Sequence, residues 1–134
     1  MVLVVLFLWS FAAATVLPLS SEVPLAVAIR QHADWKLPVF VSTLGNYLGA
    51  CTTFLLARAA AARFAADASP RARHAAGLLR RFGAPALLLS WVPLVGDVLV
   101  ALAGAAKLPF GWFSLWVVIG KGGRYLFVAW LALR

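Results

Sequence analysis

Two carboxylic acids, Glu22 and Asp97, lie inside long apolar stretches of the chain, in LPLSSEVPL (17–25) and VPLVGDVL (92–99). A carboxylate at bilayer depth costs at least about 2.5–3.5 kcal/mol, so it needs a partner or a wet cavity. A carboxyl group held between burial and a neighbouring cation can change its protonation near neutral pH. Glu22 and Asp97 are therefore candidates for proton-linked groups. The alternative is that each only stabilises the N-terminus of the helix that follows it.

Two cations, Lys121 and Arg124, lie three residues apart in the last apolar stretch, within GKGGR (120–124). Residues at this spacing share one face of a helix. A guanidinium suits phosphate recognition, so the pair indicates a polar cavity that accepts an anionic lipid headgroup. A purely structural ion-pair network with the two acids is the alternative. Asn46 and Ser90 are supporting polar residues, and we expect Asn46 to bond one of the acids.

Other residue types give no support for catalysis. His32 and His74 are isolated, and Cys51 is the only cysteine, so none has the spacing of metal ligands. The serines beside Glu22 have no histidine partner in the sequence, which argues against nucleophilic catalysis. The sequence therefore predicts no enzyme, no metal and no cofactor.

The composition indicates an integral membrane protein. Of 134 residues, 64 % are hydrophobic and 12 % charged, whereas soluble domains have roughly half apolar and a quarter charged residues. The formal net charge is +8, and six of the twelve basic residues fall between Arg58 and Arg81. Because apolar segments of membrane length flank this basic block, the positive-inside rule explains it better than nucleic-acid binding does. We expect no nucleic-acid partner.

Four apolar segments occupy residues 1–29, 37–58, 83–106 and 109–133. The second and fourth are long enough to cross a hydrocarbon core of roughly 30 Å. The first and third are interrupted near their middles, and the expected hairpin-breaking residues are Pro18, Pro24, Pro93 and Gly96. A cleaved signal peptide is the alternative for the N-terminus, although its first residues lack the usual positive charge.

The two halves of the chain follow one plan. At an offset of 75 residues, LPLSSEVPLAVA aligns with VPLVGDVLVALA, and Gly45-Asn46 with Gly120-Lys121. We therefore predict an all-α membrane fold with an inverted repeat of a re-entrant helical hairpin plus a transmembrane helix. Residues 1–58 form the first hairpin and span, 59–82 a basic linker, and 83–134 the second hairpin and span. The alternative is four kinked spanning helices.

Two further patterns concern helix packing. Ser69-Pro70 is typical of a helix start, and the stripe Ala75, Leu78, Leu79 and Phe82 opposite arginines predicts an amphipathic helix in the headgroup region. In the second segment, the small residues Ser42, Gly45, Gly49 and Thr53 predict close contact with another helix.

The stretches LLLSWVPLVGDVLVALAG (87–104) and GKGGRYLFVA (120–129), with LPLSSEVPL and GNYLGACTTFLLAR (45–58), resemble the small YqaA-type branch of the DedA superfamily of bacterial inner-membrane proteins. The resemblance implies paired re-entrant hairpins and spans in inverted orientation, movement of anionic lipids such as phospholipids or undecaprenyl phosphate, and Glu22 and Asp97 as essential carboxylates. Larger members carry arginines where this chain has Ser90 and Gly96, so the cationic role would fall to Lys121 and Arg124.

These observations favour a multi-pass protein of the bacterial inner membrane that acts as a proton-linked transporter or flippase of an anionic lipid. Its expected partners are membrane lipids and protons, and a homodimer is compatible with its small size. A membrane scaffold or assembly factor that transports nothing is the alternative from a different functional class.

Overall fold

The computed structural model describes residues 1–15, 20–60, 70–92 and 95–134, without the side chains of 71–73 and 75–76. Its elements, in chain order, are α1 (Val2–Ala13), α2 (Glu22–Gln31), α3 (Lys36–Ala59), α5 (Pro70–Phe82), the 3₁₀ helix η1 (Ala84–Trp91), α6 (Val95–Ala105) and α7 (Phe110–Ala132). These ranges contain no strand, which agrees with the predicted all-α class. Pro18, Pro93 and Ser69 lie outside the described residues.

The two longest helices, α3 and α7, correspond to the apolar segments expected to cross the membrane. Their 24 and 23 residues give lengths of about 36 Å and 34 Å at 1.5 Å per residue. Both are apolar and long enough to cross a bilayer. The other helices of the described ranges are each too short to do so alone, at about 15–20 Å.

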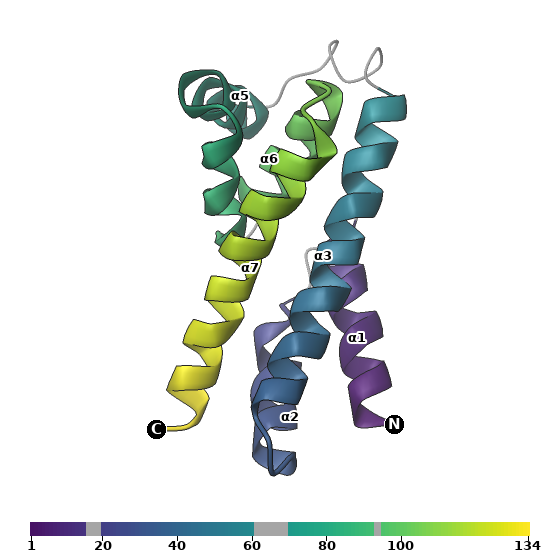
Figure 1. Ribbon diagram of the computed structural model, residues 1–134, viewed down its shortest axis with the longest axis vertical. Helices are drawn as coiled ribbons and strands as arrows, with labels where there is room; N and C mark the ends of the chain where they lie inside the picture. Colours follow the sequence, from purple (N-terminus) through teal and green to yellow (C-terminus); the bar gives the residue numbers. More distant parts are fainter. Residues whose placement is uncertain (16–19, 61–69, 93–94) are drawn as a thin grey trace.

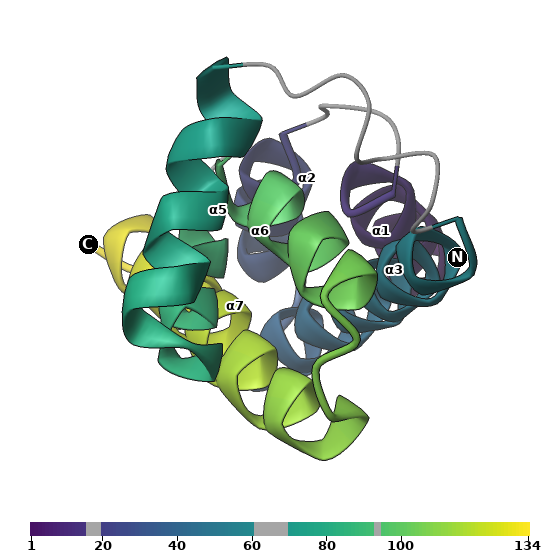
Figure 2. The same cartoon turned by 90° about the horizontal axis from the view of Figure 1, so that it is seen from above.

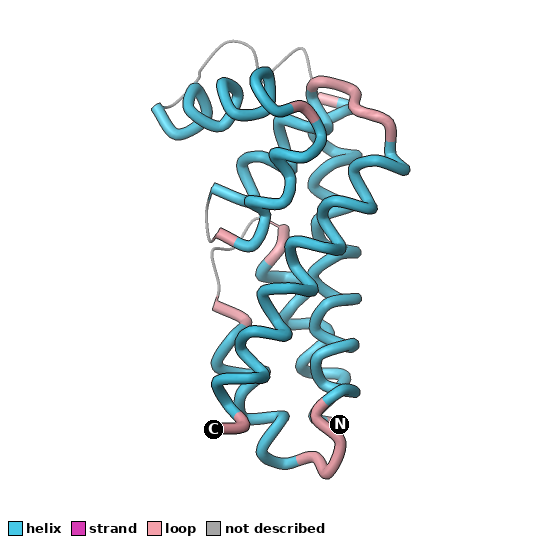
Figure 3. Tube along the Cα trace, turned by 60° about the vertical axis from the view of Figure 1, so that its left-hand side comes forward, coloured by secondary structure: helices cyan, strands magenta, loops and turns pink. Residues whose placement is uncertain are grey.

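The short helices lie toward opposite ends of the molecule (Figure 1). The helices α1 and α2 lie at the end that holds both chain termini, and α5 and α6 lie at the other end. The trace in Figure 3 shows the same division from another side. Each half contributes one short helix that packs on its own long helix, α1 on α3 and η1 on α7. The other short helix of each half packs on the long helix of the opposite half, α2 on α7 and α6 on α3.

Small residues bring α1 and α3 close together, as the small-residue stripe predicted. A Cβ on Gly45 would lie 2.6 Å from the carbonyl oxygen of Phe7, and one on Gly49 would lie 2.8 Å from the Cβ of Ala14. Neither position can therefore accept a larger side chain while α1 stays in place. Thr53 adds a hydrogen bond of 3.1 Å from its hydroxyl to the carbonyl of Ala14.

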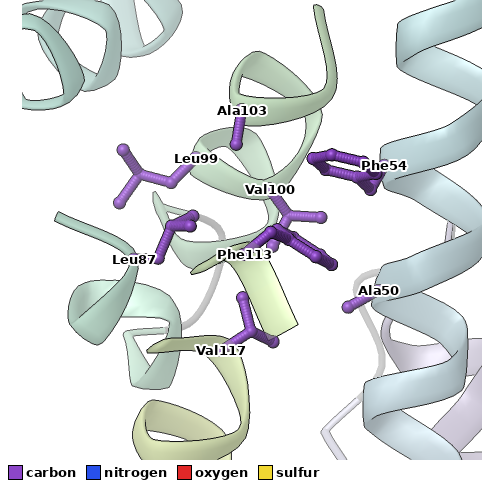
Figure 4. Close-up of a cluster of buried hydrophobic side chains, with 8 residues drawn as sticks. All are labelled: Ala50, Phe54, Leu87, Leu99, Val100, Ala103, Phe113 and Val117. Atoms are coloured by element: carbon purple, nitrogen blue, oxygen red, sulfur yellow. The ribbon is translucent and has the colours of Figure 1, made fainter. Parts of the chain in front are cut away.

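The main apolar core lies where α6, η1 and the start of α7 meet α3 (Figure 4). The rings of Phe54 and Phe113 stack with their centroids 4.1 Å apart. A second cluster joins α1, α2, the start of α3 and the end of α7, and includes Leu25, Ile29 and Tyr125. Together these clusters fix the short helices on the long pair.

The amphipathic helix predicted in the linker is present as α5, which begins at Pro70. Seen from above in Figure 2, it lies across the end of the molecule beside α6. Leu78 and Leu79 pack against the main core, whereas Arg80 and Arg81 are exposed. Two members of the predicted apolar stripe thus face the protein, whereas a third, Phe82, is exposed.

Large apolar side chains cover the outer faces of α3 and α7. Exposed examples are Phe40, Leu44, Leu48, Leu55 and Leu56 on α3, and Trp112, Leu115, Ile119, Phe127, Trp130 and Leu131 on α7. Soluble monomers rarely expose apolar surfaces of this extent. This surface is suited to contact with lipid hydrocarbon.

Candidate functional site

Glu22 forms an ion pair with Arg124 across the interface of α2 and α7. The guanidinium donates from both Nε, at 2.9 Å, and Nη2 to the same carboxylate oxygen. The Ser20 hydroxyl donates to the other carboxylate oxygen. Both charged side chains are only partly exposed, at 35 % for Glu22 and 14 % for Arg124, so the pair is shielded and still reachable.

Asp97 forms the second ion pair, with Lys121. Its carboxylate oxygen lies 3.6 Å from the ammonium, which is an ionic contact rather than a hydrogen bond. Asp97 is about one-third exposed, whereas the Lys121 side chain is almost completely buried. The ammonium instead donates a hydrogen bond to Oδ1 of Asn46 on α3.

Asn46 therefore bonds a cation, where we expected it to bond one of the acids. Its Nδ2 group donates to the carbonyl of Ser10 on α1, at 3.0 Å. That bond fixes the amide so that its oxygen faces the Lys121 ammonium. The difference arises because the buried ammonium needs acceptors and Asp97 lies too far away to supply a hydrogen bond.

Both acids lie in the first turn of a helix that follows an interruption, Glu22 in α2 and Asp97 in α6. A negative charge there is favoured by the helix dipole, so the helix-stabilising role suggested by the sequence is compatible with the ion pairs. The local sequence thus places each acid at a helix start, and α7 supplies the cation to both.

Ser21 and Tyr125 form a contact that no sequence pattern predicted. Their hydroxyl oxygens lie 2.6 Å apart in a buried setting. Each residue is the neighbour in sequence of a member of the Glu22–Arg124 pair. The only signal available was that both lie inside the quoted motifs, LPLSSEVPL and GKGGRYLFVA. Together the two contacts hold the start of α2 against α7.

A groove of about 1010 Å³ opens between α2, η1 and α7. Glu22 and Arg124 line it together with apolar side chains, among them Val23, Leu88, Trp91, Phe127 and Leu131. Asp97 and Lys121 are not among its lining residues. The two ion pairs therefore differ in their surroundings: one faces the groove, and the other joins a partly exposed carboxylate to an ammonium that is buried next to α3.

The remaining predicted positions surround these pairs. Pro24 is the third residue of α2 and Gly96 the second residue of α6, so each lies just inside the helix after an interruption. Gly96 packs on the backbone of Ser90, since a Cβ there would lie 2.5 Å from the Ser90 carbonyl oxygen. The buried hydroxyl of Ser90 has no hydrogen-bond partner among the described residues.

No three His, Cys, Asp or Glu side chains gather as a metal site would require within the part of the chain that the structure describes. The polar chemistry found there consists of two ion pairs, their hydrogen bonds and buried hydroxyl groups. Such an arrangement can bind an anion at Arg124 or carry a proton on a carboxylate.

An all-helical fold, two helices of membrane length and a lipid-suited surface define this chain as a membrane protein. It belongs to the family of the inner membrane protein YqaA. It is 40 % identical to inner membrane protein YqaA of Escherichia coli strain K12 over 126 residues, which cover 92 % of this chain and 86 % of that protein. The YqaA protein of Shigella flexneri matches with the same figures.

An uncharacterized protein of Haemophilus influenzae is 37 % identical over 138 residues, covering 95 % of this chain and 85 % of its own length. No family model matches the chain, and no solved structure does either. Membership of the wider DedA superfamily accordingly stays a prediction.

Proposed function

We propose that the protein is a multi-pass transporter or flippase of the bacterial inner membrane that moves an anionic lipid with the help of protons. The observation that best supports this function is the Glu22–Arg124 ion pair, which lies in an otherwise mostly apolar groove between α2, η1 and α7. The groove offers apolar surface to an acyl or prenyl chain and a cation to a phosphate.

The pair supports proton linkage because the Glu22 carboxylate and an anionic ligand would compete for the same cation, Arg124. A phosphate approaching Arg124 would take over hydrogen bonds that Glu22 now accepts. Glu22 would then lose its cation in a groove of low polarity, where the charged form of a carboxyl is disfavoured. Uptake of a proton by Glu22 would compensate for that loss, so that lipid binding and protonation occur together.

The arrangement of the helices supports a DedA-like inverted repeat. At an offset of 75 residues, α2 and α3 correspond to α6 and α7. The helices α1 and α2 lie toward one end of the molecule, and α5 and α6 toward the other (Figure 1). In addition, α2 packs on α7 of the other half, and α6 packs on α3. Re-entrant hairpins that enter from the two sides of the membrane would have this geometry, with polar groups meeting inside it.

A membrane scaffold or assembly factor is the second candidate, and the Asp97–Lys121–Asn46 contacts favour it. Lys121 and Asn46 are buried, Asp97 is about one-third exposed, and the three residues link α6, α7 and α3. They have the character of a structural network that specifies helix packing. A scaffold would use the Glu22–Arg124 pair in the same way, to hold α2 on α7.

The deciding experiment is reconstitution into liposomes with fluorescent phosphatidylglycerol and, separately, labelled undecaprenyl phosphate, under an imposed pH gradient. We expect movement between leaflets that depends on the gradient and is lost in Glu22→Gln, which keeps the size and hydrogen-bonding oxygen of the side chain but not its charge. Asp34→Asn is the matched control, because Asp34 is exposed and bonds only the backbone of Lys36 among the described residues. Equal activity of Glu22→Gln and the parent would refute the proton linkage, and no lipid movement by any protein would favour the scaffold.

A further inference from the structure

Buried polar residues gather where α1, α3 and α7 meet. Asn46 on α3 bonds both Lys121 on α7 and the Ser10 carbonyl on α1. The helices α3 and α7 run in opposite directions (Figure 1), so the turn of α3 before Asn46 lies beside the turn of α7 after Lys121. Ser42 and Tyr125, each four residues away, therefore share this region. All five residues are buried, with at most 3 % of their surface exposed.

This cluster contains polar atoms that still need hydrogen-bond partners. The hydroxyls of Ser10 and Ser42 are completely buried and have no partner among the described residues. The Lys121 ammonium has three N–H donors. Among the described residues it bonds Asn46, and the carboxylate of Asp97 lies 3.6 Å away. Buried groups of this kind normally bond ordered water, which makes about three hydrogen bonds and needs only about 10–15 Å³ of space.

We propose that Ser10, Ser42 and Lys121 form a binding site for internal water, and that this water carries protons between Glu22 in the groove and Asp97. The inference rests on the proposed function, because it gives the proton taken up by Glu22 a route through the protein. Both ends of the route can be reached from outside, since the Glu22 and Asp97 side chains are each about one-third exposed. The residues between them are buried.

The hydroxyl pair of Ser21 and Tyr125 connects the water site to the groove. The two oxygens lie 2.6 Å apart, and either can be the donor. A proton can therefore pass through the pair in either direction. On the groove side, Ser21 directly precedes Glu22 in the chain. On the interior side, the Ser10 hydroxyl lies close to that of Tyr125.

The transfer leaves every group between the two ends with the protons it had at the start. Protonated Glu22 gives its proton, through water in the groove, to the Ser21–Tyr125 pair, which passes one of its own protons to the internal water. The water gives a proton to Lys121 as the Lys121 ammonium gives one to Asp97. Glu22 ends as a carboxylate and Asp97 as a carboxylic acid, while Lys121 remains an ammonium.

Solid-state NMR of protein labelled with ¹⁵N-lysine in phosphatidylcholine liposomes tests the water site. Lys36, Lys107 and Lys121 are the lysines of the chain, and Lys121 is the buried one. Lys121→Met identifies its signal. In the parent, we expect magnetisation to pass from water to the Lys121 ammonium. In Ser10→Ala/Ser42→Ala, which removes both hydroxyl partners of the water, this transfer should be lost.

The matched control is Ser114→Ala, which removes a hydroxyl of α7 that bonds Tyr47 and should leave the transfer to Lys121 unchanged. Absence of transfer to Lys121 in the parent would overturn the water site. Transfer in Ser10→Ala/Ser42→Ala equal to that in the parent would overturn it as well. Neither result depends on lipid movement.

Tyr125→Phe tests the proton path in the liposome assay with labelled lipid and an imposed pH gradient. We expect gradient-driven lipid movement to be lost, because the hydroxyl that joins the groove to the water is gone. Lipid binding in zwitterionic nanodiscs should be retained, because Glu22 and Arg124 are still present, whereas a purely structural role of Tyr125 would weaken binding too. Tyr47→Phe, which loses the bond to Ser114, is the control and should behave as the parent.

Gradient-driven movement by Tyr125→Phe equal to that of the parent would overturn the proton path. If the parent itself moves no lipid, the proposed function fails and the proton path fails with it. The NMR result still decides the water site in that case, so the two failures can be told apart.

Discussion

Lys121 and Asn46 bond each other directly, and they occupy corresponding positions of the two halves, 75 residues apart. Two elements related by an approximate two-fold axis bring corresponding residues into contact only at that axis. The bond therefore places the interior polar network at the centre of the proposed repeat. The difference between the two side chains, an amide and an ammonium, also means that the two halves are chemically unequal there.

Removing the Lys121 ammonium should destabilise the fold. Lys121→Met keeps the length of the side chain but leaves the buried Oδ1 of Asn46 without its donor, at an expected cost of about 2 kcal/mol. Asp97 is partly exposed and can be hydrated instead. Thermal unfolding in detergent measures the effect. Lys36→Met, at an exposed position, should change stability by less than about 0.5 kcal/mol.

The double variant Lys121→Met/Asn46→Leu should recover part of that loss, because replacing both partners of a buried hydrogen bond by apolar groups can be nearly neutral. A loss equal to the sum of the two single effects would mean that the Lys121–Asn46 bond does not stabilise the protein.

Replacing Arg124 by lysine should separate charge from geometry. Arg124→Lys retains the cation but cannot donate two parallel hydrogen bonds to a phosphate, and it loses the fork that donates from Nε and Nη2 to one oxygen of Glu22. We expect weaker binding of the anionic lipid by roughly tenfold, the equivalent of about 1.4 kcal/mol. Lipid titration of the protein in zwitterionic nanodiscs, followed by the fluorescence of a label in the groove, measures this. An unchanged affinity would argue against Arg124 as the phosphate contact.

Two glycines of α7 should respond differently to the same substitution. A Cβ on Gly120 would lie 2.6 Å from the Ser90 hydroxyl oxygen and 2.9 Å from the Leu88 carbonyl oxygen, whereas one on Gly111 would meet nothing within 4 Å. Gly120→Ala should therefore cost about 1–3 kcal/mol by forcing η1 away from α7. Gly111→Ala should be neutral or stabilising, by up to about 1 kcal/mol, because alanine favours helix. Thermal unfolding of both variants tests the contrast, and equal values would show that η1 does not pack tightly on α7.

The sequence predicted the parts of this molecule that depend on local patterns. The apolar lengths of 37–58 and 109–133 located α3 and α7, and Pro70 marked the start of α5. The spacing of Gly45 and Gly49 predicted a close helix contact, which α1 makes. Each of these features follows from residues that are near one another along the chain.

Contacts between residues that are far apart in the sequence were predicted less completely. The sequence grouped the two acids with the two cations, but the pairing of Glu22 with Arg124 and of Asp97 with Lys121 depends on how α2 and α6 lie on α7. Trp91 and Phe127 could not be assigned to the groove, because their exposure depends on which faces η1 and α7 leave uncovered. Nor did any sequence pattern show that Asn46 would bond Lys121.

The proposed re-entrant hairpins can be separated from four spanning helices by the location of the chain's end. If α1 with α2, and η1 with α6, each return to the side from which they enter, the chain crosses the membrane only through α3 and α7. The arginine-rich linker should then be cytoplasmic, and Arg134 should lie on the opposite side. Reporter fusions after Ser69 and after Arg134 test this, with an enzyme active only in the cytoplasm and one active only outside it. Four complete spans would place both fusion points in the cytoplasm. That outcome would remove the inverted arrangement of the two halves.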